Sequence, residues 1–355
     1  MRVRRFIIIV TLVLLTPYLV QAQYLYKLPP PRALYAPCDT ATLFIIGDVM
    51  MHSKQLSHDC EYFLKYIEPR MQKADFCIAN MEFPLGGEPY TGYPAFSTPD
   101  WYAEYIARCG TDVFLTANNH VLDRGLSGFK RTLKVYDRMA DSLGIRYTGI
   151  GNDPLIIRRR GLCIALVNFT YGTNMGPETS RPDVMRMRKP DVKASIDKAL
   201  AAGADFIVAL PHWGQEYVLK HSDSQASWAR WLVDQGCCAV VGSHPHVVQD
   251  TTHVNGIPII YSLGNAVSNM SLENTRLELA VTLRFVYDRN SGQKRMLEPQ
   301  LDFMWCTLPG RLTPSYATIF VKDWEGKRDC WIDPSDYDNM MATLRRVCAA
   351  TGIEN

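Results

Sequence analysis

The sequence predicts an α/β fold in which strands and helices alternate along one large domain. Seven apolar runs have the length of a strand and are flanked by turn residues, at positions 42–46, 76–79, 113–116, 163–168, 206–210, 239–241 and 257–261. Several of these runs are apolar on both faces, as buried central strands are. Helical patterns lie between many of them, at positions 101–108, 129–143, 192–202 and 224–235. Strands that alternate with helices favour a layered α/β core.

The C-terminal part of the sequence departs from this alternation. Two strand-like segments, at residues 277–287 and 294–303, flank the turn Asn290-Ser291-Gly292, which is typical of a β-hairpin. Residues 335–349 carry a helical pattern. We therefore predict a main domain over residues 41–322 that includes this hairpin, followed by a helical extension over residues 323–355.

The N-terminus has the pattern of a secretory signal peptide. Three arginines among the first five residues precede an apolar run at residues 6–15, Pro17 interrupts the run, and small residues favour cleavage after Ala22. An uncleaved anchor is the alternative, but the run is shorter than the roughly 20 residues that a spanning helix needs. We expect a signal peptide over residues 1–22, a proline-rich linker over residues 23–40 and no stable membrane span after cleavage. The exported protein would be periplasmic, at the cell surface or secreted.

The composition excludes several classes of protein. Hydrophobic residues make up 47% and charged residues 21% of the 355 residues, which is ordinary for a globular protein and unlike a disordered chain. The formal net charge of +2 gives no general attraction to nucleic acid, so we expect no nucleic-acid partner. The 10 cysteines show no C-x-x-C spacing, and we expect core cysteines with one disulfide bond among Cys306, Cys330 and Cys348.

Polar side chains follow six of the predicted strands at the point where each strand ends. The segments are Gly47-Asp48, Asn80-Met81-Glu82, Asn118-Asn119-His120, His212-Trp213-Gly214-Gln215-Glu216-Tyr217, His244-Pro245-His246 and Ser262-Leu263-Gly264-Asn265. In layered α/β folds, ligands bind at the carboxyl ends of strands, so we expect these groups to converge.

Each of these groups has an ordinary explanation on its own. Asp48 after a glycine could be a cap or a turn former, and His212 and Glu216 could form a salt bridge within one helical turn. His244 and His246 are the exception, because two histidines at strand spacing point to one face and attract a divalent cation. If all six groups were structural, six unrelated coincidences would be needed at one position of the fold.

The chemistry of the set predicts a metal site. Carboxylates, amides and imidazoles without a thiolate favour a divalent ion, with Mn, Zn or Fe preferred over Ca or Mg. One tetrahedral ion cannot use so many ligands, whereas two ions roughly 3.5–4 Å apart that share one carboxylate would use them all. His120, beside the ligand Asn119, suits the role of general acid or base.

The order of the motifs resembles that of the CapA family of poly-γ-glutamate capsule synthesis proteins, a branch of the calcineurin-like metallophosphoesterase superfamily. The resemblance spans about residues 41–270 and includes the segment Asn168-Phe169-Thr170-Tyr171-Gly172-Thr173-Asn174. It implies a four-layer α/β/β/α sandwich of the metallophosphoesterase type, with a dinuclear metal site at the strand ends.

The resemblance also implies roles for individual residues. Asp48 and His246 would bind the first ion, and Glu82 would bridge both ions in place of the usual aspartate. The ligands of the second ion would be Asn119, His212 and His244. His120 takes the position of the proton-donating histidine of the superfamily, and Asp123 of the same motif is the second candidate catalytic residue.

One position departs from the pattern of the superfamily. Met50 stands where the first motif, Asp-x-His, has its histidine, which weakens the first metal site, so one or two ions would be bound. His52 could compensate only if the loop turns it back toward the site.

Four residues are candidates for substrate binding. Glu216, Tyr217 and Asn265 belong to the matched motifs, and Arg181 belongs to the basic loop at residues 171–190. This loop is either an ordinary solvated loop or a recognition element for an anionic substrate, because arginine offers a planar fork to carboxylates and phosphates.

Two functions fit these expectations. The first is an exported metal-dependent hydrolase or transferase linked to capsule (poly-γ-glutamate) biosynthesis or processing, with an anionic polymer or a phosphoester as substrate and other capsule-synthesis proteins as candidate partners. The second is a non-catalytic envelope protein that binds or tethers capsular polymer, an alternative suggested by Met50. A metal site is expected in both.

Overall fold

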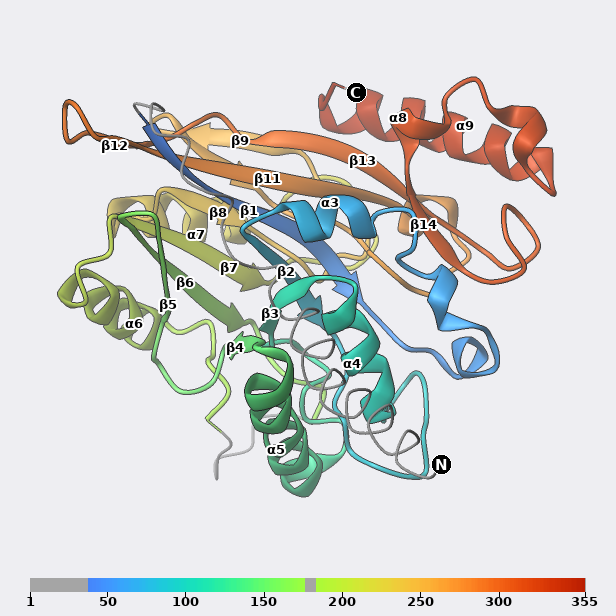
Figure 1. Ribbon diagram of the computed structural model, residues 1–355, viewed down its shortest axis with the longest axis horizontal. Helices are drawn as coiled ribbons and strands as arrows, with labels where there is room; N and C mark the ends of the chain where they lie inside the picture. Colours follow the sequence, from blue (N-terminus) through green and yellow to red (C-terminus); the bar gives the residue numbers. More distant parts are fainter. Residues whose placement is uncertain (1–37, 176–182, 355) are drawn as a thin grey trace, which may run out of the picture. The chain divides into compact units, whose positions relative to one another are not determined.

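Two β-sheets packed face to face form the centre of the computed structural model, which describes residues 38–175 and 183–354 (Figure 1). The expected signal peptide, most of the expected linker and Arg181 lie outside the described residues. All elements below belong to the unit Asp39–Asn355, except that the first strand begins at Cys38.

The first sheet combines a parallel half with an antiparallel half. Its strand order is β14-β13-β11-β1-β2-β3-β4, and β12 pairs with β11. Strands β1 to β4 run parallel, whereas β11 to β14 pair antiparallel with one another. The bounds are β1 (Cys38–Val49), β2 (Phe76–Met81), β3 (Thr111–Leu115), β4 (Arg146–Thr148), β11 (Leu277–Asp288), β12 (Lys294–Met296), β13 (Gln300–Thr307) and β14 (Ala317–Phe320).

The second sheet has the order β5-β6-β7-β8-β10-β9. Its four central strands are parallel, and the two edge strands pair antiparallel with their neighbours. The bounds are β5 (Leu155–Arg159), β6 (Leu162–Thr170), β7 (Phe206–His212), β8 (Ala239–Val241), β9 (Thr251–Val254) and β10 (Ile257–Ile260).

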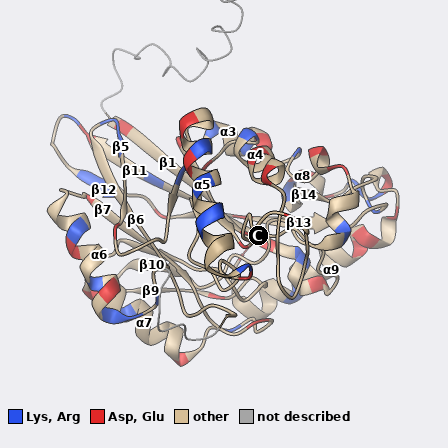
Figure 2. Cartoon of the chain, turned by 90° about the horizontal axis from the view of Figure 1, so that it is seen from below, with Lys and Arg blue, Asp and Glu red and all other residues tan. Residues whose placement is uncertain are grey.

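Helices cover the outer face of each sheet, which confirms the predicted four-layer α/β/β/α sandwich (Figure 1). Apolar side chains of α3 (Glu68–Lys73), α4 (Asp100–Arg108) and α5 (Gly125–Leu143) pack on the first sheet. Those of α6 (Lys189–Ala201) and α7 (Asp223–Asp234) pack on the second. The cluster between the sheets is mostly aliphatic, as expected for strands that are buried on both faces. Acidic and basic residues are interspersed over these helices and do not gather into one patch (Figure 2).

The C-terminal elements close one end of the core between the sheets. The predicted hairpin is present as β11 and β12, but its second arm is divided, because β13 pairs with β11 as a separate strand. A short helix, α8 (Val321–Trp324), precedes the predicted C-terminal helix, α9 (Pro334–Thr351). Three side chains of α9, Met340, Leu344 and Val347, join the apolar cluster between the sheets.

A buried ion pair attaches α9 to the rest of the fold. The guanidinium of Arg276 donates two hydrogen bonds to the carboxylate of Asp336, at 2.7 and 2.6 Å, and lies 4.3 Å from the ring centroid of Trp305. Both charged side chains are almost fully buried. Such a pair is costly to break, because the remaining charge loses its partner in a medium of low dielectric constant.

All ten cysteines are free thiols, so the disulfide bond expected among Cys306, Cys330 and Cys348 is absent. Cys306 is buried, whereas Cys330 is exposed.

Among the described residues, no helix has the length and apolar character needed to cross a membrane.

The ion pair of α9 gives a stability prediction. We expect Asp336→Ala to lower the free energy of unfolding by roughly 3–5 kcal/mol, because it leaves the Arg276 guanidinium buried without its partner. Asp338→Ala is the matched control, since Asp338 lies on the same helix and pairs with Arg328 at the surface. That change should leave the free energy essentially unaltered. Urea unfolding measures both, and an equal effect of the two substitutions would contradict the assigned role of Arg276 and Asp336.

Candidate metal centre

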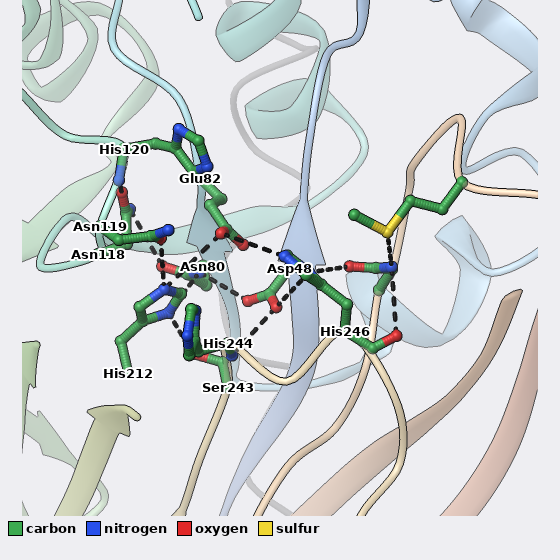
Figure 3. Close-up of polar contacts among 12 residues, drawn as sticks. Asp48, Asn80, Glu82, Asn118, Asn119, His120, His212, Ser243, His244 and His246 are labelled. Carbon is green, nitrogen blue, oxygen red and sulfur yellow. Dashed lines mark hydrogen bonds and ion pairs between the residues drawn. The ribbon is translucent and has the colours of Figure 1, made fainter. Parts of the chain in front are cut away.

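The carboxyl ends of strands from both sheets meet at one place (Figure 3). Asp48 lies near the end of β1 and Glu82 directly follows β2, both in the first sheet. His212 is the last residue of β7, and His244 follows β8, both in the second sheet. The convergence predicted from the strand ends is therefore present.

A bulge in β1 presents Asp48 to this site. The register of β1 against β2 shifts between Ile46 and Asp48, at Gly47. A Cβ atom on Gly47 would lie 2.0 Å from the carbonyl oxygen of Gly264, so only glycine fits there. The amide of Gly47 donates a 2.6 Å hydrogen bond to the buried Glu278. The bulge is thus held from two sides.

The side chains form two groups of potential ligands that share one residue. Glu82, His212 and His244 make up one group, and Asp48, Glu82 and His246 make up the other. Within each group the ligand atoms lie within 4.8 Å of one another, and every side chain is buried. Asn119 joins the first group, because its Oδ1 lies 2.8 Å from His212 Nε2. Glu82 is the residue that the two groups share.

Some ligand atoms of the two groups have no hydrogen-bond partner within the protein, which fits the binding of divalent ions. Among the described residues, both carboxylate oxygens of Glu82 and Nδ1 of His244 have no hydrogen-bond partner, although they are buried. A buried carboxylate without a donor is strongly unfavourable unless a positive charge compensates it. A divalent ion in each group would supply that charge.

Burial sets the protonation of these groups. Burial, together with the nearby charge of Asp48, raises the pKa of Glu82 well above its ordinary value. Burial lowers the pKa of His244 to about 3 and that of His212 well below its ordinary value, so both imidazoles are neutral and able to bind a metal. For Asp48, burial alone would raise the pKa, but the hydrogen bond with His246 and the charge of His246 outweigh burial and lower it to about 2.

Amide and hydroxyl groups orient the ligands. Asn80 Nδ2 donates to Asp48 Oδ1 at 2.7 Å, and Ser243 Oγ lies 3.0 Å from His212 Nδ1. The backbone amide of His244 donates to Asp48 Oδ2 at 3.1 Å. No role was assigned to Asn80 or Ser243 from the sequence. Asn80 stands in the same motif as Glu82, and Ser243 directly precedes His244. Such outer partners fix the rotamers of ligands and their basicity.

Asn265, a candidate substrate-binding residue, lies behind the site. Its side chain is fully buried, and Oδ1 is 2.8 Å from His246 Nδ1. Its Nδ2 donates to the carbonyl oxygen of Thr275 at 3.0 Å. This geometry favours orientation of His246 over contact with a substrate.

The candidate catalytic residues form a dyad next to the ligands. His120 Nδ1 lies 2.6 Å from Asp123 Oδ2, which also accepts a hydrogen bond from the backbone amide of Phe96 at 2.8 Å. The ring of Phe96 packs edge-on against His120, with 4.7 Å between centroids. Asn174 Nδ2 is 3.2 Å from His120 Nδ1, so it adds a contact that sequence reasoning did not assign. Asp123 therefore fixes the orientation and tautomer of the imidazole.

The structure separates Met50 and His52 from both ligand groups. Met50 packs within the apolar cluster under the first sheet, and its carbonyl oxygen accepts a hydrogen bond from Tyr102. His52 Nδ1 lies 3.2 Å from Gln55 Oε1 and 3.3 Å from the amide of Asn269. Among the described residues, neither side chain belongs to a ligand group. The ion at Asp48 and His246 would thus have one protein ligand fewer than the superfamily pattern.

Exposed aromatic side chains flank the centre. The ring of Tyr171 lies 4.6 Å from that of His244, and the ring of Tyr217 lies 6.1 Å from that of His246. Both are about half exposed. Glu216 is partly buried, and its charge contributes to the raised pKa of Glu82. These three residues thus border the two ligand groups.

The cations in the described part of the basic loop contact other residues of the protein. Arg186 donates to Thr173 Oγ1 at 3.1 Å, and Arg188 pairs with Asp191 at the start of α6. Lys189 lies over the rings of Trp228 and Trp231. These contacts explain the three cations structurally, and Arg181 lies outside the described residues.

The fold and the site define a layered α/β protein with paired, carboxylate-sharing ligand groups at its strand ends. The chain belongs to the bacterial capsule synthesis protein PGA_cap family, whose sequence model matches residues 42–270. The resemblance found in the motifs is therefore confirmed, and all six proposed metal ligands lie within the matched part.

Individual relatives point in the same direction. The chain is 29% identical over 257 residues to the capsule biosynthesis protein CapA of Bacillus anthracis, which covers 66% of this chain and 61% of the relative. It is 27% identical over 263 residues to the PGA biosynthesis protein CapA of Bacillus subtilis, with 70% and 69% covered. The match thus spans less than two thirds of the Bacillus anthracis protein.

Two solved structures match this chain at low identity and with low TM-scores. A phosphatase from Mycoplasma pneumoniae matches with a TM-score of 0.43 and 12% identity, covering 75% of this chain and 93% of that one. A 5′-nucleotidase from Candida albicans matches with a TM-score of 0.40 and 11% identity, covering 70% and 52%.

The shared carboxylate gives the first prediction for the site. We expect Glu82→Gln to lower the content of bound transition metal in both positions, because the neutral amide removes the charge that both ligand groups use. Glu216→Gln is the control, since Glu216 is a nearby carboxylate outside both ligand groups. Elemental analysis of the purified proteins measures the effect. Full metal content in Glu82→Gln would show that Glu82 is not the shared ligand.

Asn265 gives the second prediction. We expect Asn265→Ala to weaken binding of Mn²⁺ by about 10–100-fold, because His246 loses the partner that orients its ring. Asn290→Ala, in the exposed turn of the hairpin, should bind Mn²⁺ like the wild type. Calorimetric titration of the chelator-treated proteins measures both affinities. If Asn265→Ala bound Mn²⁺ normally and only substrate affinity fell, the original assignment to substrate binding would be correct.

Proposed function

We propose that the chain is an exported metal-dependent hydrolase of the metallophosphoesterase type that acts in the biosynthesis or processing of capsular poly-γ-glutamate. The observation that carries this proposal is the buried carboxylate of Glu82, shared by two ligand groups next to the His120–Asp123 dyad. The predicted signal peptide and the capsule-synthesis relatives support a place at the cell envelope. The proposed substrate is a phosphoester or a γ-glutamyl polymer.

The ligand set suits hydrolysis. When two divalent ions are bound, they supply a hydroxide nucleophile at neutral pH and neutralise charge on a phosphoryl or carbonyl oxygen. Asp48 and His246 would hold one ion, Asn119, His212 and His244 would hold the other, and Glu82 would hold both. The ligands come from two sheets that pack on a common core, so their positions are rigid before substrate binds.

His120 would move the proton in this reaction. Its Nδ1 faces Asp123, which leaves Nε2 as the nitrogen that protonates the leaving group. Asp123 accepts the Nδ1 proton in a hydrogen bond and so keeps Nε2 available for proton exchange with the leaving group. The flanking rings of Tyr171 and Tyr217 would orient the substrate and exclude water from one side.

Loss of His120 gives a test of this assignment. We expect His120→Ala to lower kcat by about 100-fold or more while the metal content stays unchanged, because general acid–base catalysis contributes roughly 10²–10⁴-fold. The assay uses the metal-loaded protein with a panel of phosphomonoesters, phosphodiesters and γ-glutamyl peptides. His253→Ala, at an exposed histidine that pairs with Glu298, is the control.

The second function, a protein that binds or tethers capsular polymer without cleaving it, makes the opposite prediction. The position of Met50 within the apolar cluster favours it, because the first ion has fewer protein ligands. In that case the wild type would bind poly-γ-glutamate without turnover of any substrate in the panel. Binding would also survive His120→Ala.

A further inference from the structure

A small pocket lies beside the metal centre, with a volume of about 280 Å³. Of its lining residues, Tyr217 ends the motif that begins with His212, and Val247 directly follows His246. The others come from the segment around the short helix η4 (Glu273–Arg276) and from α9. The complete lining is Tyr217, Val247, Leu272, Glu273, Asn274, Thr275 and Arg346.

The pocket shares a wall with the metal centre. The ring of Tyr217 lies 6.1 Å from that of His246, and the amide of Tyr217 donates to the carbonyl oxygen of Pro245 at 2.8 Å. On the other side, the carbonyl oxygen of Thr275 accepts from Asn265, the residue that orients His246. A group held in this pocket would therefore extend a substrate whose reacting bond lies at the ligands.

Contacts within the protein fix the position of Arg346 in the lining of the pocket. The Arg276–Asp336 ion pair joins η4 to α9, the helix that carries Arg346. Nε and Nη2 of Arg346 donate to Asn274 Oδ1 at 3.1 and 2.7 Å, and Nη2 also donates to Thr343 Oγ1 at 3.1 Å. A guanidinium has five donors, and among the described residues Nη1 of Arg346 has no acceptor, so both of its N–H groups are left for a ligand. Arg346 also lies beyond residues 42–270, which the family model matches.

The two charged side chains of the pocket have opposite signs. Glu273 and Arg346 both line it, and the contacts of the described residues include no ion pair between them. The exposed side chains of Tyr217 and Leu272 add apolar surface to the pocket. Pockets for drug-sized ligands start at about 300 Å³, so this pocket suits a single residue-sized group. One anion and one cation that do not neutralise each other match a group that carries both charges.

We propose that this pocket binds the free α-amino acid end of an acidic substrate, with its carboxylate at Arg346 and its ammonium at Glu273. The amino-terminal residue of a γ-glutamyl chain carries both groups on one carbon atom. The proposal rests on the proposed function, since it places the next link of that chain at the metal centre. It assigns the chain end, rather than the interior, as the part that is recognised.

Calorimetric binding to the Mn²⁺-loaded full chain tests this proposal. The probes are tri-γ-glutamate with a free amino terminus and the same trimer with an acetylated amino terminus. For the wild type we expect acetylation to weaken binding about tenfold, which is the usual size for loss of a charged hydrogen bond. Glu273→Gln should bind both trimers alike, because it has lost the group that distinguishes them.

Variants of α9 complete the experiment. Arg346→Ala should weaken binding of the free trimer about tenfold. Arg346→Gln, which keeps a donor for Asn274, should behave in the same way. Arg345→Ala is the matched control, since Arg345 is the exposed neighbour on the same helix and does not line the pocket. Thermal unfolding of each variant confirms that the fold is intact.

The outcomes separate this inference from the proposed function. Equal affinity of the wild type for the two trimers, or normal binding by both Arg346 variants, would overturn the inference even if the protein hydrolyses γ-glutamyl links. The expected binding pattern without turnover would refute the proposed hydrolase function and leave the subsite in place. Absence of measurable binding of either trimer would also overturn the inference.

Discussion

The buried carboxylate of Glu82 is the constraint on which the rest of the site depends. Neither of its two oxygens accepts a hydrogen bond from the described residues, and a second buried carboxylate, that of Asp48, lies nearby. Such an arrangement is strongly unfavourable in a protein interior unless cations occupy it. The neutral imidazoles of His212 and His244 stand on one side, and His246 stands on the other. A divalent metal centre would make the arrangement favourable, and the other features of the site keep these ligands in place.

Three residues at or beside the metal centre have strained backbone conformations. His244, His246 and Tyr217 have positive φ angles of 103°, 57° and 66°, a region that residues other than glycine rarely adopt. Each costs roughly 1–3 kcal/mol and persists where surrounding contacts over-determine the geometry. Those contacts are present here: the amide of His244 bonds to Asp48, the ring of His246 to Asn265, and the amide of Tyr217 to Pro245. The strain is therefore concentrated where the ligands and the shared pocket wall lie.

The interior of this fold could be predicted from the sequence, and its edges could not. Central strands such as β1, β6 and β7 each contain a continuous apolar run, because these residues are buried on both faces of the sheet. The four strands that the sequence did not predict, β4, β5, β9 and β14, are three to five residues long and form the four edges of the two sheets. Likewise, the ligands at strand ends could be predicted because topology brings them together. The role of Asn265 and the position of Arg346 depend on contacts between distant segments, which local patterns do not encode.

The central claim is that two metal ions occupy the ligand groups joined by Glu82. Anomalous X-ray diffraction from crystals of the Mn²⁺-loaded protein tests it most directly. The account predicts one anomalous peak among Glu82, Asn119, His212 and His244, and a second among Asp48, Glu82 and His246. The second should be the weaker, because Met50 supplies no ligand there. A metal-loaded crystal with no peak at Glu82 would contradict the account.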